Sequence, residues 1–175
     1  MRETGVETPL DFRPGRVPRP ALWLGLGGLI PFAALAAAAH LAPSPWDFRA
    51  LAFQAGYGAS ILSFMGGCRW GFAAAEVDEE GASWWRMGVA VAPALLAWVS
   101  LMASPAAGAL VCALGLLALF AADVSLTRAG GAPTWWPALR LPLTVGAVLG
   151  LLVGAAAGDD VFSASALLDS GLAAL

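Results

Sequence analysis

The chain has 175 residues, of which 59% are hydrophobic and 12% are charged, and its mean hydropathy is +0.77. A soluble domain has about 25% charged residues, and one core of this size cannot bury so much apolar surface, so an ordinary soluble fold is excluded. The net charge of -3 offers no basic surface for nucleic acid, and two cysteines are too few for a disulfide framework or a zinc site.

The first 20 residues predict an irregular cytoplasmic arm, because they contain four prolines. Acidic residues within this arm argue against a mitochondrial transit peptide. A secretory signal is an alternative, since arginines precede the following apolar run and Ala37–Ala39 resembles a cleavage site. That run extends to Ala42, which is long for a signal peptide, and we therefore favour its retention as a membrane anchor.

Five apolar stretches are each long enough to cross the hydrocarbon core, which takes about 20 helical residues. They cover residues 21–42, 50–75, 86–104, 106–126 and 137–158. Pro31 and Pro93 lie within the first and third stretches and should bend them. The expected fold is an all-α, integral membrane bundle of five transmembrane helices over residues 21–158. An acidic, amphipathic tail follows over residues 159–175, either as a short interfacial helix or as disordered chain.

The distribution of arginine predicts the orientation of this bundle, because cytoplasmic loops carry an excess of basic residues. With five alternating spans and a cytoplasmic N-terminus, the C-terminus lies outside and only Arg49 falls on the outer side. The other eight basic residues fall on the cytoplasmic side: Arg2, Arg13, Arg16, Arg19, Arg69, Arg86, Arg128 and Arg140.

Tryptophans gather at the same predicted cytoplasmic ends. Indole rings favour the headgroup region, so we interpret these residues as interface anchors, with ligand stacking as the alternative. The predicted anchors are Trp70, Trp84, Trp85, Trp135 and Trp136.

Small residues recur at helical spacing on two of the spans and predict faces on which another helix packs closely. The sequence leaves open whether the packing partner belongs to the same chain. The two sets are Gly56, Ser60, Gly67 and Gly71 on the second span, and Gly146, Gly150, Gly154 and Gly158 on the fifth.

Three charged residues fall at one membrane depth on three different spans: Arg69, Asp123 and Arg140. Ionisable groups inside a span are costly and need partners, so these side chains form a candidate ionic cluster. One carboxylate between two guanidiniums leaves a positive charge suited to a lipid headgroup or another anion. The alternative is that both arginines extend to lipid phosphates while Asp123 orients its own helix.

Polar residues on the second span, Gln54, Tyr57 and Ser63, suggest a polar seam, for which hydrogen bonding between helices is favoured over transport. The sequence shows no metal-ligand set, nucleophile elbow or phosphate-binding loop. We therefore expect no catalytic residues, no metal, no cofactor and no enzymatic activity.

Several motifs resemble those of the transmembrane protein 69-like family, which is named for a domain of unknown function. They are the runs Leu24–Phe32, Ile61–Gly71 after Tyr57, and Ala132–Thr144 after Asp123, with Phe-x-Gly-Gly-x-x-Trp-Gly at residues 64–71 as the most specific. The resemblance covers about residues 20–155. It implies a small multi-pass protein of bacterial inner (cytoplasmic) membranes and of mitochondria, and it implies no activity.

Two functions follow as hypotheses. The first is a non-enzymatic accessory, assembly or scaffolding factor for a membrane complex, with membrane lipids and other membrane-protein subunits as partners. The second is a small transporter or a lipid- or anion-binding protein that uses the polar seam of the second, fourth and fifth spans. A water-accessible cavity reaching the midplane would favour the second hypothesis, and a filled bundle with glycine faces open to lipid would favour the first.

Overall fold

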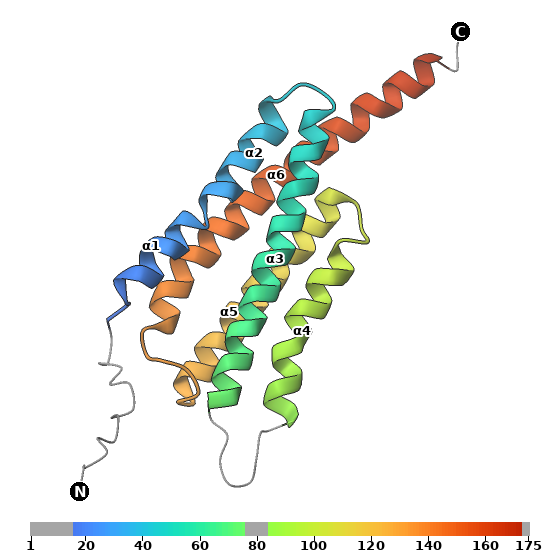
Figure 1. Cartoon of the computed structure of the whole chain (residues 1–175). Helices are drawn as coiled ribbons and strands as arrows, with labels where there is room; N and C mark the ends of the chain where they lie inside the picture. Colours follow the sequence, from blue (N-terminus) through green and yellow to red (C-terminus); the bar gives the residue numbers. More distant parts are fainter. Residues whose placement is uncertain (1–15, 76–83, 173–175) are drawn as a thin grey trace, which may run out of the picture.

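The computed structural model describes residues 16–75 and 84–172, with side chains as far as residue 158. These residues form no strand and six helices: α1 (Arg19–Gly27), α2 (Ile30–Leu41), α3 (Trp46–Ala75), α4 (Trp84–Ser100), α5 (Pro105–Arg128) and α6 (Trp136–Leu172). Figure 1 shows an elongated bundle in which α2 to α6 run in alternating directions. Most of the predicted N-terminal arm and the acidic segment after Ala75 lie outside the described residues.

The first predicted span is divided into α1 and α2. Proline has no N–H, so Pro31 removes a donor from the helical hydrogen-bond ladder. The chain turns just before it, where the Gly28 N–H donates to the carbonyls of Leu24 and Gly25, both at 3.0 Å. The bend predicted at Pro31 is therefore a short interruption at Gly28 and Leu29.

Three segments of the described chain are long and apolar enough to cross a membrane: Arg19–Leu41, Pro105–Arg128 and Trp136–Gly158. They support a helical membrane protein, and they are fewer than the five spans expected. The difference concerns α3 and α4. The 30 residues of α3 include Gln54, Tyr57 and Arg69, which lower its hydropathy, and α4 has only 17 residues.

The end of the last helix differs from the expectation. Instead of a separate tail after Gly158, α6 continues to Leu172, and Figure 1 shows its C-terminal part extending beyond the other helices. No proline follows Gly158 in this segment, so no backbone donor is lost there and the helix can continue.

Two side chains of the predicted polar seam hold helices together. The Gln54 side-chain amide donates to the Phe32 carbonyl at 3.1 Å and to the Gly150 carbonyl at 2.8 Å, and so links α3 to α2 and α6. The Tyr57 hydroxyl donates to the Gly28 carbonyl at 2.9 Å, at the break between α1 and α2. These contacts are hydrogen bonds between separate segments of the chain, as the sequence favoured for the polar seam.

The glycines of α6 pack within the chain. A Cβ atom placed at these positions would collide with side chains of neighbouring segments: Leu29 for Gly146, Phe32 for Gly150, Gln54 for Gly154 and Ala106 for Gly158. The predicted packing face on the fifth span is thus occupied by other parts of the same molecule.

The small residues predicted to pack on α3 remain open. Space surrounds the positions where Cβ atoms of Gly56, Gly67 and Gly71 would lie, and Ser60 is exposed. The α3 glycines that do pack are Gly58 against Leu151, and Gly66 against the Ala90 carbonyl and Pro93 on α4. Within this chain, the face that carries Ser60 is therefore not a packing face.

Candidate functional site

Arg69, Asp123 and Arg140 meet inside the bundle and are called here the ionic cluster. Arg69 Nη1 donates to Asp123 Oδ1 at 2.8 Å, and Arg140 Nε donates to Asp123 Oδ2 at 3.0 Å. The relative exposures of the side chains are 1% for Asp123, 3% for Arg140 and 11% for Arg69. Each carboxylate oxygen of Asp123 therefore has its own guanidinium partner.

The helices bring the cluster together from three separate parts of the sequence. Arg69 lies near the C-terminal end of α3, Asp123 near that of α5, and Arg140 in the second turn of α6. The Thr127 hydroxyl donates to the Asp123 backbone carbonyl at 3.0 Å, so Asp123 is tied to the chain on its main-chain side as well. Because Arg140 is buried, extension of that side chain to lipid phosphates does not describe its position.

The cluster carries one positive charge in excess, because two guanidiniums share one carboxylate. A buried charge without a partner is strongly disfavoured, and a nearby anion would remove this cost. Arg140 also has an atom, Nη2, that is buried and has no hydrogen-bond partner. The geometry is therefore suited to receive an anionic group from the side of Arg140.

An apolar cavity of about 340 Å³ lies beside Arg140. Its walls come from α1, the α1–α2 junction, α2, α3, α5 and α6. Apolar residues form most of the surface, among them Leu24, Phe64, Leu116 and Leu143. This composition is unlike a water-filled path and resembles a pocket for an apolar molecule.

Three residues on one face of α6 line this cavity and also carry buried polar atoms without partners. Trp136 Nε1, Arg140 Nη2 and Thr144 Oγ1 are all buried and have no hydrogen-bond partner. An unsatisfied buried polar group costs about 1–3 kcal/mol. Native proteins rarely leave such groups unpaired, and binding of a molecule that accepts hydrogen bonds would satisfy them. We call Trp136, Arg140 and Thr144 the donor row.

Comparison with known proteins identifies the family. Residues 17–156 match the family described as "Protein of unknown function (DUF3429)". The chain belongs to the DUF3429 family. It is 39% identical over 155 residues to "Transmembrane protein 69" of Xenopus tropicalis, a match that covers 86% of this chain and 59% of that protein. It is 31% identical over 137 residues to "Transmembrane protein 69" of Mus musculus, covering 78% of this chain and 55% of the relative.

The family assignment confirms the resemblance drawn from the sequence motifs. All members of the ionic cluster and of the donor row lie inside the region that matches DUF3429. The chain spans less than two thirds of the length of these two relatives. No solved structure is significantly similar to it.

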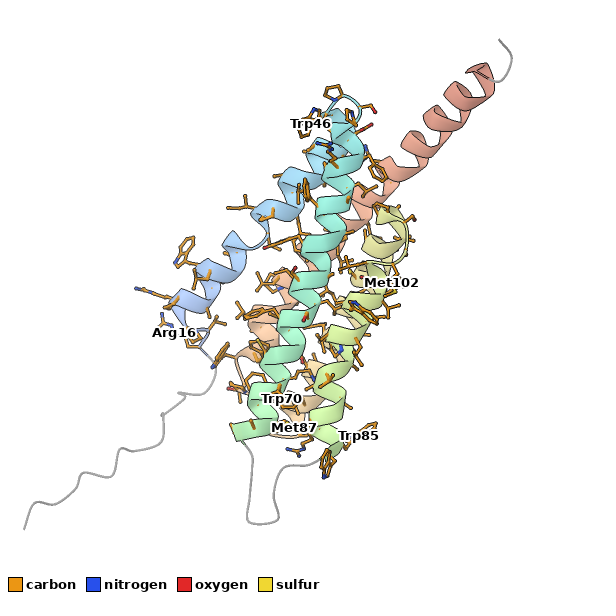
Figure 2. All side chains as sticks on the ribbon, turned by 45° about the vertical axis from the view of Figure 1, so that its right-hand side comes forward. Arg16, Trp46, Trp70, Trp85, Met87 and Met102 are labelled. Carbon is orange, nitrogen blue, oxygen red and sulfur yellow. The ribbon has the colours of Figure 1, made fainter. Side chains whose placement is uncertain are left out.

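The tryptophans of this DUF3429 protein differ in their surroundings. Figure 2 shows Trp70 and Trp85 at the end of the bundle opposite Trp46, and Trp84 is the most exposed of the predicted anchors, at 94%. Trp136 does not fit the anchor interpretation, because it is 7% exposed. Its ring packs edge-to-face on Phe72 and Trp135, with ring centroids 5.2 and 5.9 Å away.

The sequence predicted Trp136 as an interface anchor and did not single out Thr144, so neither was expected beside the ionic cluster. The signal that could have found them is spacing. Trp136 and Thr144 lie four residues before and after Arg140, which the sequence already indicated as part of a possible anion site. This spacing places all three residues on one helix face. Among the described residues, no group of histidine, cysteine and acidic side chains could hold a metal ion.

Proposed function

We propose that this DUF3429 protein is a non-enzymatic membrane protein that binds an anionic group, such as a lipid headgroup, inside its helical bundle. One observation carries the proposal: the buried ionic cluster has two guanidiniums for one carboxylate. The neighbouring cavity is mainly apolar, which supports binding of a lipid-like molecule over transport of a hydrated solute.

We further propose that the protein crosses a bacterial inner membrane five times, with the N-terminus in the cytoplasm and the C-terminus outside. The positions of the arginines support this map. The helix ends that carry Arg69, Arg86, Arg128 and Arg140 lie together at one end of the bundle, and Arg49 lies at the other. A concentration of basic residues on one side is typical of the cytoplasmic side of an inner membrane.

Anion binding is tested by thermal unfolding of the purified protein in a nonionic detergent. Inorganic phosphate, an anionic phospholipid and a fatty acid are each compared with zwitterionic phosphatidylcholine. A bound ligand at 100 times its dissociation constant stabilises a protein by about 2.7 kcal/mol, so at least one anion should raise the melting temperature. Equal melting temperatures with every anion and with phosphatidylcholine would contradict the proposal.

A second candidate function is favoured by the open small-residue face of α3. Ser60, Gly67 and Gly71 are exposed, and space surrounds both glycines, so a helix of another membrane protein could approach the α3 backbone closely. This arrangement supports an accessory, assembly or scaffolding factor for a membrane complex.

The scaffolding candidate is tested by pull-down of the tagged protein from its native membrane in mild detergent. Gly67→Leu adds bulk to the open face and should remove a co-purifying membrane subunit without lowering the stability of the chain. The matched control is Ala156→Leu, which adds similar bulk at an exposed position of α6, away from this face of α3. Retention of the same partners by Gly67→Leu would argue against this candidate.

A further inference from the structure

We infer that the apolar cavity binds a single-chain amphiphile with a carboxylate head, of which a long-chain fatty acid is the simplest example. The inference rests on the proposed anion binding and specifies the ligand. Its basis is the donor row, in which three side chains that line one wall of an otherwise apolar cavity each have a buried polar atom without a hydrogen-bond partner.

The head of the ligand is placed by charge and hydrogen bonding. Arg140 keeps one bond to Asp123 through Nε, and its buried Nη2 remains without an acceptor. A carboxylate accepts hydrogen bonds only and carries the single negative charge that the ionic cluster lacks. Thr144 lies one turn farther along α6, about 6 Å by helical rise, and its hydroxyl can donate to the same head.

The tail of the ligand is placed by the remaining walls. Beyond Thr144 the cavity is lined by Phe32 and Ala147, which are both buried and apolar. Arg140 lies near the start of α6, at the end of the bundle where the arginines gather. The apolar tail of the ligand would therefore run from that end toward the interior of the bundle. A lipid in the cytoplasmic leaflet has this same direction, with its head at the interface and its tail toward the midplane.

The size and opening of the cavity favour one chain over two. A volume of about 340 Å³ is near the lower limit of ligand pockets, which run from about 300 to 1,000 Å³, and a two-chain phospholipid needs more room. Leu24 and Phe64 line the cavity and are 78% and 63% exposed, so the cavity is open on the outer surface between α1 and α3. In the proposed topology that surface faces lipid, which gives an amphiphile a lateral entrance.

Binding is measured with the full chain in phosphatidylcholine nanodiscs, by thermal unfolding and by crosslinking to a photoreactive palmitic acid. Palmitate is compared with its methyl ester, which has the same chain and no charge. Palmitate should raise the melting temperature and crosslink to peptides of α1, α3 and α6, and the ester should do neither. Equal effects of palmitate and the ester would overturn the inference.

A pair of variants tests the site itself. Thr144→Glu places a carboxylate of the chain one turn from Arg140, so it should take the position of the ligand head and weaken palmitate binding by about tenfold or more. Thr144→Gln is the matched control, because it has nearly the same size without the charge and should bind palmitate more tightly than Thr144→Glu. Equal palmitate affinity in these two variants would show that the head does not lie at Arg140.

A milder substitution tests the same site if the Thr144→Glu variant does not fold. Thr144→Val keeps the shape of the side chain and removes the unpaired hydroxyl, and it should weaken palmitate binding by about two- to tenfold. Ser60→Ala, which removes an exposed hydroxyl on α3 outside the cavity, should leave binding unchanged. An unchanged palmitate affinity in Thr144→Val would remove the Thr144 hydroxyl from the site and contradict the donor row as its basis.

The outcomes separate the inference from the function on which it rests. Stabilisation by phosphatidylglycerol or inorganic phosphate without stabilisation by palmitate would leave anion binding intact and make the proposed ligand class wrong. Absence of stabilisation by any of these anions would contradict both.

Discussion

Asp123 lies between the guanidinium groups of Arg69 and Arg140, and its single negative charge cannot neutralise both. Each oxygen of its carboxylate bonds a different arginine, and all three side chains are largely shielded from solvent. Attraction inside a bundle is stronger than in water, and the cost of desolvating each charge is also large. Such a cluster contributes little net stability, but removal of its only carboxylate leaves two guanidiniums facing each other.

Asp123→Asn should therefore destabilise the protein by about 3–5 kcal/mol, because the cluster would lose its negative charge. The double change Asp123→Asn with Arg140→Gln should cost less, since the remaining Arg69 retains some exposure and can turn outward. Unfolding in detergent measures these two variants and the single change Arg140→Gln. Asp47→Asn is the control, because Asp47 contacts only the N–H of Phe48 at the start of α3 among its described hydrogen bonds. Additive losses from the two single changes would show that Asp123 and Arg140 are not coupled.

The residues of the ionic cluster could be predicted from the sequence, and the inward positions of Trp136 and Thr144, the other two residues of the donor row, could not. Charges inside apolar spans are rare enough that Arg69, Asp123 and Arg140 stand out, and alternating spans place them at one depth. Trp136 precedes an apolar run, as an interface anchor would, and a lone threonine in such a run has many structural roles. Whether Trp136 and Thr144 face the interior of the bundle depends on which face of α6 packs against the neighbouring helices.

At the scale of the helices, similar glycine patterns have different surroundings. On α6 the pattern faces Phe32, Gln54 and other parts of the chain, whereas on α3 the exposed pattern faces away from the rest of the molecule. The sequence predicted small-residue faces on both helices, but spacing alone does not reveal which helix lies opposite. The break at Pro31 was predictable because proline removes a donor, and the continuation of α6 to Leu172 was not.

Gly150→Leu should destabilise the fold by about 1–3 kcal/mol, because a Cβ atom at Gly150 would lie 2.8 Å from Phe32 Cβ. Gly67→Leu is the matched control. Its Cβ atom would have nothing within 4 Å, and loss of a helical glycine should leave stability unchanged or slightly higher. Thermal unfolding of the two variants in the same detergent makes the comparison. Equal melting temperatures for both would mean that α6 does not pack on α2 through Gly150.

At the scale of the whole molecule, the number of spans depends on α3 and α4. By helical rise, α3 is about 45 Å long and α4 about 25 Å, so α3 exceeds a hydrocarbon core of about 30 Å while α4 falls slightly short of it. Gln54, Tyr57 and Arg69 lower the hydropathy of α3, but each donates a hydrogen bond to another segment of the chain. Satisfied polar groups of this kind are compatible with a position inside the membrane.

Topology reporters decide between three spans and five, provided that one reporter lies between α3 and α4. Both counts are odd, so reporters at the two chain ends should show a cytoplasmic N-terminus and an external C-terminus in either case. A reporter inserted after Ala75 is different. It should be cytoplasmic if α3 crosses the membrane, and external if only Arg19–Leu41, Pro105–Arg128 and Trp136–Gly158 cross it.

We expect the cytoplasmic result. The ionic cluster requires the C-terminal end of α3 to lie at the same depth as the second turn of α6, because Arg69 and Arg140 share Asp123. The start of α3 follows directly on α2, at the opposite end of the bundle in Figure 1. We therefore expect the helix that connects these two ends, beside the span of α6, to cross the membrane as well. A reporter inserted after Arg128 should also be cytoplasmic and serves as the control. An external signal after Ala75, with a cytoplasmic signal after Arg128, would make the five-span topology wrong.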